Sequence, residues 1–204
     1  IALRNGSSIT TGSSSVAGGV VWLGGGADGG TWEGVSVGQG YAVPGTAFTP
    51  SDGGNNIITG VYLERSSISS FGGGIKIAGG ASTDFSGIVT YGNTVAIDAG
   101  SGVVAIDGQA SDGTGDGSGI LFGIHDNTIA STVNILSSST GAAITLTGTG
   151  QGTGEAIGLS GTVNITSSGG GNILLSGDAQ GTGGSIVAGN YYNAILNVYA
   201  DSGS

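Results

Sequence analysis

The sequence predicts an all-β fold, a right-handed parallel β-helix with about three short strands in each turn of about 30 residues. Three observations support it: strand-like segments repeat along the chain, apolar and polar residues alternate within each segment, and Gly or Ser follows most segments. Because one short strand cannot bury its apolar side alone, equivalent strands of successive turns are expected to stack around a continuous core. Right-handed winding is expected because parallel crossover connections almost always have that hand.

Two segments carry the clearest repeats. Residues 144–154 (ITLTGTGQGTG) recur 29 positions later as residues 173–183 (ILLSGDAQGTG). Residues 132–138 (TVNILSS) recur 30 positions later as residues 162–168 (TVNITSS). A looser unit, residues 1–11, recurs 60 positions later. Three strand types therefore follow one another with a common period.

Apolar residues occupy positions i and i+2 in each unit, as in Val104/Ile106. Side chains alternate between the two faces of a strand, so these pairs are expected to point inward and the intervening residues outward. Glycines at the corners are expected to supply positive φ angles. Turns are expected to start near Ile1, Val35, Val61, Ile88, Ile120, Ile157 and Ile186. One inward column is expected to contain Ile77, Ile106, Leu146 and Leu175.

The chain is interpreted as one domain, residues 1–204, of six to seven turns. Residues 38–60 break the rhythm because they contain both prolines, Pro44 and Pro50. Proline donates no backbone hydrogen bond, so this stretch is expected to be a lateral loop. Residues 55–58 are expected to return the chain to the stack.

Composition excludes several classes of protein. Lys and Arg total 3 against 13 Asp and Glu, a net charge of -10, so neither nucleic acid nor an anionic membrane surface is an expected partner. The absence of Cys excludes disulfides and thiolate metal sites, and no apolar run approaches the ~18 residues of a membrane-spanning helix. A surface of Ser, Thr, Asn and Gly is typical of extracellular β-proteins. We therefore predict an extracellular or bacterial cell-surface location, with any export signal outside these residues.

The strands and Gly-Thr-Gly turns of residues 144–154 and 173–183, together with residues 162–169 and 1–11, carry a family resemblance. They resemble the repeats of filamentous-haemagglutinin-like large exoproteins. The resemblance covers most of the chain and rests on composition and period. It implies a secreted bacterial adhesin, often exported by two-partner secretion, although the amino-terminal secretion motif of that family is not visible here.

Candidate sites for chemistry are few. Asp112 and Asp116, in the string DGTGDGSG, are the most site-like pair, because carboxylates separated by glycines suit calcium; a solvated loop is the favoured alternative. Asp98 and Asp107 follow similar Val-Ala-Ile strings and are considered as acids sharing one face. His125 is considered as a base oriented by Asp126, with an exposed turn residue favoured instead. The three cations, which lie in no acid cluster, are Arg4, Arg65 and Lys76.

Aromatic and amide residues suggest surface features. Trp22 and Tyr62 each lie between two inward residues and should point outward, either as a glycan or partner patch or beneath the loop of residues 38–60. Tyr191 and Tyr192 fall at a corner. The recurring asparagines are expected to form a hydrogen-bonded ladder: Asn134, Asn164 and Asn197. An ice-binding array of threonines such as Thr145 is not expected, because Lys76, Ala105 and Asp107 interrupt it.

These observations predict a structural protein and not an enzyme, with no catalytic residue, metal or cofactor assigned. The expected role is a shaft segment of a long secreted adhesin or surface filament. Its expected partners are further repeats of the same chain or other subunits stacked end to end, with a glycan or cell-surface partner left open. A carbohydrate-binding or carbohydrate-cleaving β-helix is the alternative.

Overall fold

The computed structural model describes residues 1–45, 47, 49–50, 57–81, 85–111, 117–124, 131–188 and 194–201. These residues form strands, turns and bends, and no helix. Seventeen of the strands belong to three parallel sheets, and two more form a separate antiparallel hairpin. The fold is therefore all-β with parallel sheets, as the sequence predicts.

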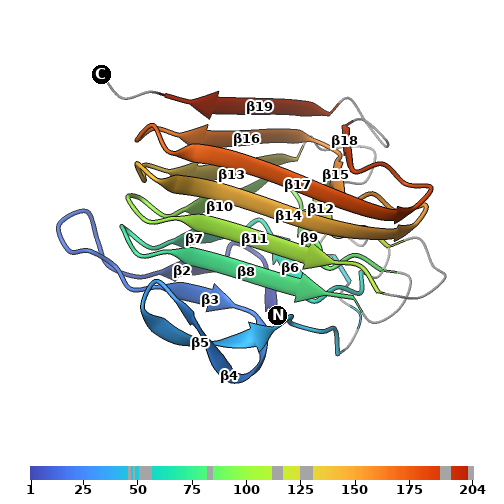
Figure 1. Ribbon diagram of the computed structural model, residues 1–204, viewed down its shortest axis with the longest axis horizontal. Helices are drawn as coiled ribbons and strands as arrows, with labels where there is room; N and C mark the ends of the chain where they lie inside the picture. Colours follow the sequence, from blue (N-terminus) through green and yellow to red (C-terminus); the bar gives the residue numbers. More distant parts are fainter. Residues whose placement is uncertain are drawn as a thin grey trace.

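The three sheets are visited in turn along the chain (Figure 1). Sheet 1 contains β1 (Ala2–Leu3), β6 (Val61–Glu64), β9 (Ile88–Tyr91), β12 (Ile120–Ile124), β15 (Ile157–Leu159) and β18 (Ile186–Ala188). Sheet 2 contains β2 (Ser8–Thr10), β7 (Ser67–Ser69), β10 (Thr94–Asp98), β13 (Thr132–Ser137), β16 (Thr162–Ser167) and β19 (Ile195–Ala200). Sheet 3 contains β3 (Val21–Leu23), β8 (Ile75–Gly80), β11 (Val104–Gln109), β14 (Ala142–Gly152) and β17 (Asn172–Gly181). We call each passage through the three sheets a circuit.

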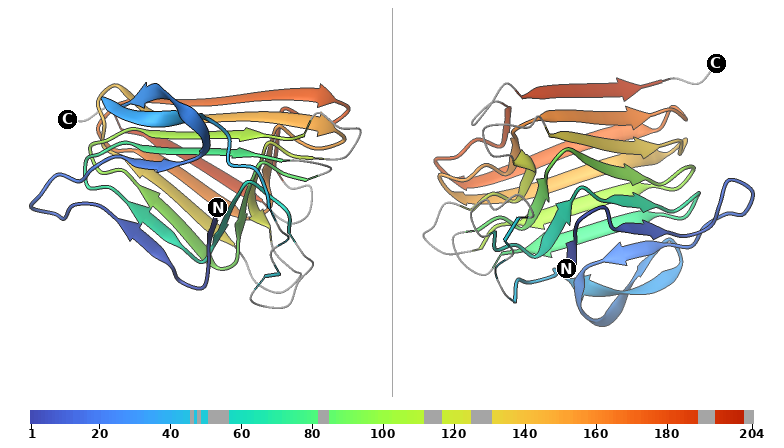
Figure 2. Two further views of the ribbon diagram at one scale, coloured as in Figure 1. Left: turned by 90° about the horizontal axis from the view of Figure 1, so that it is seen from below. Right: turned by 180° about the vertical axis from the view of Figure 1, so that it is seen from behind.

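The core lies between the three sheets, which form the sides of a roughly triangular cross-section (Figure 2, left). Within each sheet, equivalent residues of successive circuits pair in register. The expected column is confirmed: the aligned residues of sheet 3 are Leu23, Ile77, Ile106, Leu146 and Leu175. A second inward column, in sheet 2, is formed by Ile9, Ile68, Ile97, Ile135, Ile165 and Val198. Alternation in the sequence thus becomes a stack of buried apolar side chains.

One glycine in each of four successive strands of sheet 3, β8 to β17, allows two sheets to approach closely. Gly108 pairs with Gly79 and Gly148, and Gly148 pairs with Gly177. A Cβ at any of these four positions would lie 2.0–2.3 Å from a carbonyl oxygen just before a sheet 1 strand, for example Ala156 O beside residue 148. None of the four has a positive φ. The expectation of positive φ applies to other corners, such as Gly100 at φ 57°, and this column has a steric reason instead.

Val35 does not start a turn, which corrects one sequence-based expectation. β4 (Gly25–Trp32) and β5 (Val35–Gly40) form an antiparallel hairpin outside the three sheets (Figure 1). Val35 and Val37 alternate in the sequence like the residues of a core strand, but in the hairpin Val37 is buried and Val35 is exposed. The chain therefore leaves the stack at Gly25, earlier than the loop predicted for residues 38–60.

Candidate functional site

The hairpin is inserted within the first strand of sheet 3. Leu23 pairs with Ile77, and Ala42 forms a parallel bridge with Gly79, so only one residue position separates their partners on β8. The Ala42 backbone continues the ladder, since its N–H donates to Ala78 O at 2.8 Å and its carbonyl accepts from Gly80 N at 2.9 Å. The insertion thus brings residues of β4 and the segment after β5 beside the outer face of sheet 3.

Tyr41 crosses the outer face of sheet 3 to reach β11. It lies at the level of Ala78, and its hydroxyl donates to Asp107 Oδ2 at 3.0 Å. Ala78 is buried between them in the sheet. Burial raises the pKa of Tyr41 to about 12, and the charge of Asp107 and the hydrogen bond to it act in the same direction. Burial also raises the pKa of Asp107, while the Tyr41 hydroxyl and Lys76 lower it.

Lys76 joins the hairpin to the sheet. Trp22 on β3 pairs directly with Lys76 on β8, and both side chains are on the outer face. The Lys76 Nζ lies 5.3 Å from the ring centroid of Trp22 and 5.3 Å from that of Trp32 on β4. Cation–π contacts at partly exposed sites contribute about 0.5–1 kcal/mol each. We call the group of Trp22, Trp32, Tyr41, Lys76 and Asp107 the aromatic platform.

An open hollow of about 320 Å³ adjoins the aromatic platform. Its lining consists of Tyr41, Val43, Gly80, Ala81, Gln109, Ala110 and Ser111. Gln109 pairs with Gly80 on the neighbouring strand, so β11 contributes Gln109 to the lining while the inserted segment contributes Tyr41. The platform and hollow together present aromatic rings, a carboxylate and an amide.

Two ladders of side-chain amides run across the strands. The Asn164 Nδ2 donates to Asn134 Oδ1 at 2.8 Å, and the Asn197 Nδ2 donates to Asn164 Oδ1 at 2.8 Å. The expected asparagine ladder is therefore confirmed. A second ladder, between Gln151 and Gln180, has a donor–acceptor distance of 2.7 Å. Both are structural contacts between layers of the stack.

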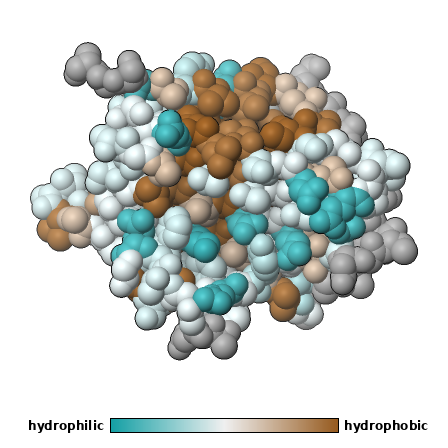
Figure 3. Space-filling model, in the orientation of Figure 1, coloured by the Kyte–Doolittle hydropathy of each residue, from teal (hydrophilic) through white to brown (hydrophobic). Residues whose placement is uncertain are grey.

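The last layer of the stack exposes apolar side chains. β17, β18 and β19 are the edge strands of their sheets, and each pairs on one side only. Figure 3 shows the resulting apolar surface at the upper end of the molecule, over β17 and β19. Its exposed members include Leu174, Ile186, Ile195, Val198 and Tyr199. We call these five residues the end surface.

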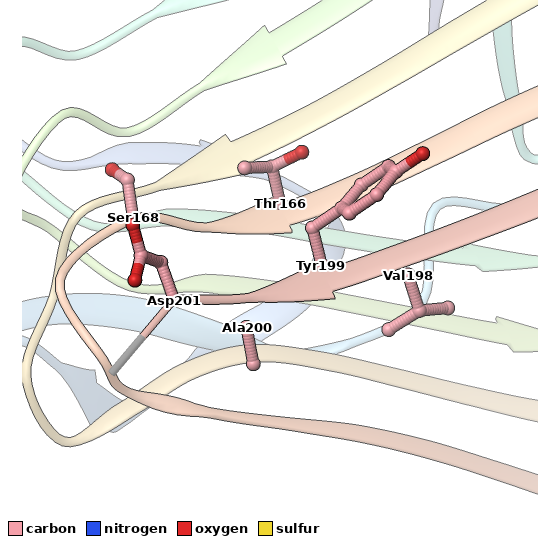
Figure 4. Close-up of a pocket in the computed structure, with 6 residues that line it drawn as sticks. All are labelled: Thr166, Ser168, Val198, Tyr199, Ala200 and Asp201. Carbon is pink, nitrogen blue, oxygen red and sulfur yellow. The ribbon is translucent and has the colours of Figure 1, made fainter. Parts of the chain in front are cut away.

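An open hollow of about 480 Å³ borders the end surface on β19. Figure 4 shows the Tyr199 ring on the same side of the sheet as Thr166, with which Tyr199 is paired, while Val198 points to the opposite side. Among the described residues, the lining of the hollow has one acidic side chain, Asp201, and no basic one. It continues the uncovered edge and has no cluster of reactive groups.

The candidate residues of the sequence are mostly dispersed. Asp98 ends a sheet 2 strand and accepts from Gly100 N at 2.8 Å, whereas Asp107 is on sheet 3, so the two acids do not share a face. Tyr62 is fully buried in a small cluster with Val89 and Tyr91, packed against Ile57. Ile57 belongs to residues 38–60, so this segment contributes one residue to the cover of Tyr62, whereas Trp22 lies beside Lys76. Lys76 and Ala105 align with Thr145, so the threonine array is interrupted as expected.

Several other predictions fall outside the described residues. Asp112 and Asp116, the calcium candidates, are among them, as are His125, Asp126, Tyr191 and Tyr192. Within the described ranges, no group of three or more His, Asp or Glu side chains gathers closely enough to hold a metal ion. Those same ranges contain no helix of the length and apolarity that crossing a bilayer requires.

Sequence reasoning missed two polar contacts. Arg4 Nε donates to Glu64 Oε2 at 3.0 Å, and Glu64 is fully buried. The signal was present, because aligning residues 1–11 with the unit that begins at residue 61 places Arg4 opposite Glu64. The Tyr41–Asp107 contact spans 66 residues and depends on the length of the inserted hairpin, for which the sequence has no second copy.

Comparison of the chain with protein-family models, with curated proteins and with solved structures finds no match.

Proposed function

We propose that this chain is a right-handed parallel β-helix that serves as a structural shaft segment of a long secreted bacterial adhesin or extracellular surface filament, without catalysis. The observation that carries the proposal is the in-register stacking of circuits around one apolar core. In such a stack, the backbone hydrogen bonds of all three sheets run along the axis. Tension along the axis is therefore shared by many parallel bonds, as a shaft requires.

The handedness, the extracellular location and the bacterial adhesin role each have separate support. Right-handed winding follows the strong preference of parallel β connections for that hand. A surface rich in Gly, Ser and Thr with 8% charged residues favours an extracellular role, and the resemblance to filamentous-haemagglutinin-like repeats favours a bacterial adhesin.

The end surface supports end-to-end stacking as the mode of assembly. Val198 continues an inward column and Ile195 pairs with Thr162, yet each is about half exposed, at 46% and 51%. In the ladder the Oδ1 of Asn134 and of Asn164 each accepts from the asparagine of the following layer, and Asn197 on the edge strand β19 is its last described member. A partner with apolar residues at i and i+2 and a polar donor between them would extend both features. We propose further repeats of the same chain, or another subunit of this fold, as that partner.

Sedimentation velocity over a range of chain concentrations tests the proposal. We expect concentration-dependent association that Val198→Glu abolishes, because a carboxylate on the end surface opposes burial of the facing layer. Leu136→Glu is the matched control, since Leu136 is 37% exposed on β13, away from the end surface. A chain that stays monomeric at all concentrations, or association that both variants weaken equally, would contradict end-to-end stacking.

A further inference from the structure

We propose that the aromatic platform and its adjoining hollow form a binding site for a neutral saccharide. This activity is independent of the shaft role, because the site is on the outer face of sheet 3 and the end surface is at the last layer. Three aromatic side chains gather there, from β3, from β4 and from the segment after β5. Two of them, Trp32 and Tyr41, reach the site because the hairpin interrupts the first strand of the sheet.

The hollow has the size and the lining of a small-molecule site. Its volume of about 320 Å³ lies within the range of about 300–1,000 Å³ typical of ligand pockets. Gly80 and Ala81 provide a floor with almost no side chain, between the Tyr41 ring and Gln109. A pyranose ring has one flat face of C–H groups, which packs against apolar and aromatic surface, and a rim of hydroxyls.

Polar groups at the edge of the hollow match those hydroxyls. The Tyr41 hydroxyl donates to Asp107 Oδ2, and among the described residues Oδ1 accepts no hydrogen bond. Gln109 is exposed, and in the same described part of the chain its side-chain amide has no hydrogen-bond partner. A carboxylate and a primary amide together offer both acceptors and donors. Such a pair recognises hydroxyl groups, each of which donates and accepts.

Charge selects a neutral saccharide over an acidic one. Asp107 is bonded to Tyr41, which lines the hollow, and the chain has a net charge of -10, so a uronate or sulfate would be repelled. The Lys76 ammonium is held over the rings of Trp22 and Trp32 and is not among the described residues that line the hollow. The chain offers the hollow no cationic lining residue among those described.

Intrinsic fluorescence gives a direct assay, because the chain has two tryptophans and both belong to the platform. The full chain is titrated with cellohexaose, xylohexaose, mannohexaose and maltohexaose as neutral probes, and with a galacturonate hexamer as the acidic probe. We expect at least one neutral probe to bind with a dissociation constant of about 1 mM or tighter, the weak end of specific recognition. The galacturonate hexamer should bind at least tenfold more weakly.

Two variants locate the binding. Gln109→Ala should weaken the neutral probe at least fivefold, as should Tyr41→Phe, which keeps the ring and releases Asp107. Gln180→Ala is the matched control, because it removes an exposed amide from the same sheet at the far end and should leave affinity unchanged. Circular dichroism verifies that each variant is folded. Failure of all four neutral probes to bind, equal or tighter binding of galacturonate, or equal losses in Gln109→Ala and Gln180→Ala would each overturn the proposal.

Discussion

Replacing Gly148 by alanine tests why glycine recurs at one position of β8, β11, β14 and β17 in sheet 3. A Cβ at residue 148 would lie 2.0 Å from the Ala156 carbonyl oxygen and 2.8 Å from Ile157 Cγ1. Cβ contacts shorter than 3.0 Å are essentially never seen, so β14 or the segment before β15 must move by about 1 Å. Neither is free to do so alone, because Gly148 is paired on both sides and Ala156 N donates to Gly184 O.

The expected cost combines two effects. Forcing an extra methyl group into a packed interior costs about 1–3 kcal/mol, and each weakened ladder hydrogen bond adds about 1 kcal/mol. We expect Gly148→Ala to lower the free energy of unfolding by about 3 kcal/mol. Gly141→Ala is the control, because a Cβ there meets nothing within 4 Å and φ is not positive. It should raise the free energy of unfolding by about 0.4–1 kcal/mol through the less flexible unfolded chain.

Urea denaturation followed by circular dichroism measures both variants. If Gly148→Ala does not fold, Gly177→Ala is measured instead. A Cβ at residue 177 would lie 2.1 Å from the Ser185 carbonyl oxygen, which is the same kind of clash. Residue 177 is on the edge strand β17, which can move away more easily than a central strand. Its loss should be smaller than that of Gly148→Ala. A Gly148→Ala variant that loses less than about 1 kcal/mol, or that is as stable as Gly141→Ala, would refute the steric argument.

Three further substitutions test polar contacts. Asn164→Ala removes two ladder hydrogen bonds and should cost about 1–2 kcal/mol in urea denaturation; unchanged stability would count against the ladder. The pKa of Tyr41 is raised from 10 to about 12, so folding favours its protonated form. That stabilisation is complete below pH 10 and is lost as the pH rises to about 12. The free energy of unfolding of Tyr41→Phe, measured over the same pH range, should fall less than that of the unsubstituted chain. Lys76→Met loses the cation–π contact to Trp32 on β4 and should speed amide exchange in β4 and β5 about 2–5-fold; unchanged exchange would contradict that anchoring role.

The repeated part of the fold could be predicted from the sequence because each position has several copies. Ile106 and Leu146 recur with the same spacing from their neighbours, and in a parallel stack equal spacing means direct pairing. The asparagine ladder followed from the same logic. Register in sheets of this kind is fixed by the apolar pattern, since a slip of one residue would turn every inward side chain outward.

Features without a second copy were not predictable in the same way. Val35 and Val37 alternate like core residues, but alternation gives the face of a strand and not the sheet that the strand joins. The prolines did indicate an interruption, although it begins at Gly25. Tyr41 and Asp107 are brought together only by the return point of the inserted segment. The aromatic platform therefore lies where the sequence departs from its own repeat.

Deleting residues 24–40 tests whether the hairpin is an addition to an otherwise complete strand. Leu23 pairs with Ile77 and Ala42 with Gly79, so Tyr41 alone can fill the position opposite Ala78 and join them. We expect the shortened chain to fold, with the stability of the later circuits intact and a loss of about 0.5–1 kcal/mol from the missing Trp32–Lys76 contact.

The matched control removes β14, residues 142–152, from the middle of sheet 3, which takes one member out of each column between β11 and β17. That variant should lose cooperative unfolding, because the circuits on either side no longer contact each other in register. Urea denaturation and amide exchange of β8 and β11 distinguish the outcomes. If the hairpin deletion unfolds β8 and β11 as the β14 deletion does, the stack needs the hairpin for its stability. The platform could then not be treated as a surface added to a complete shaft.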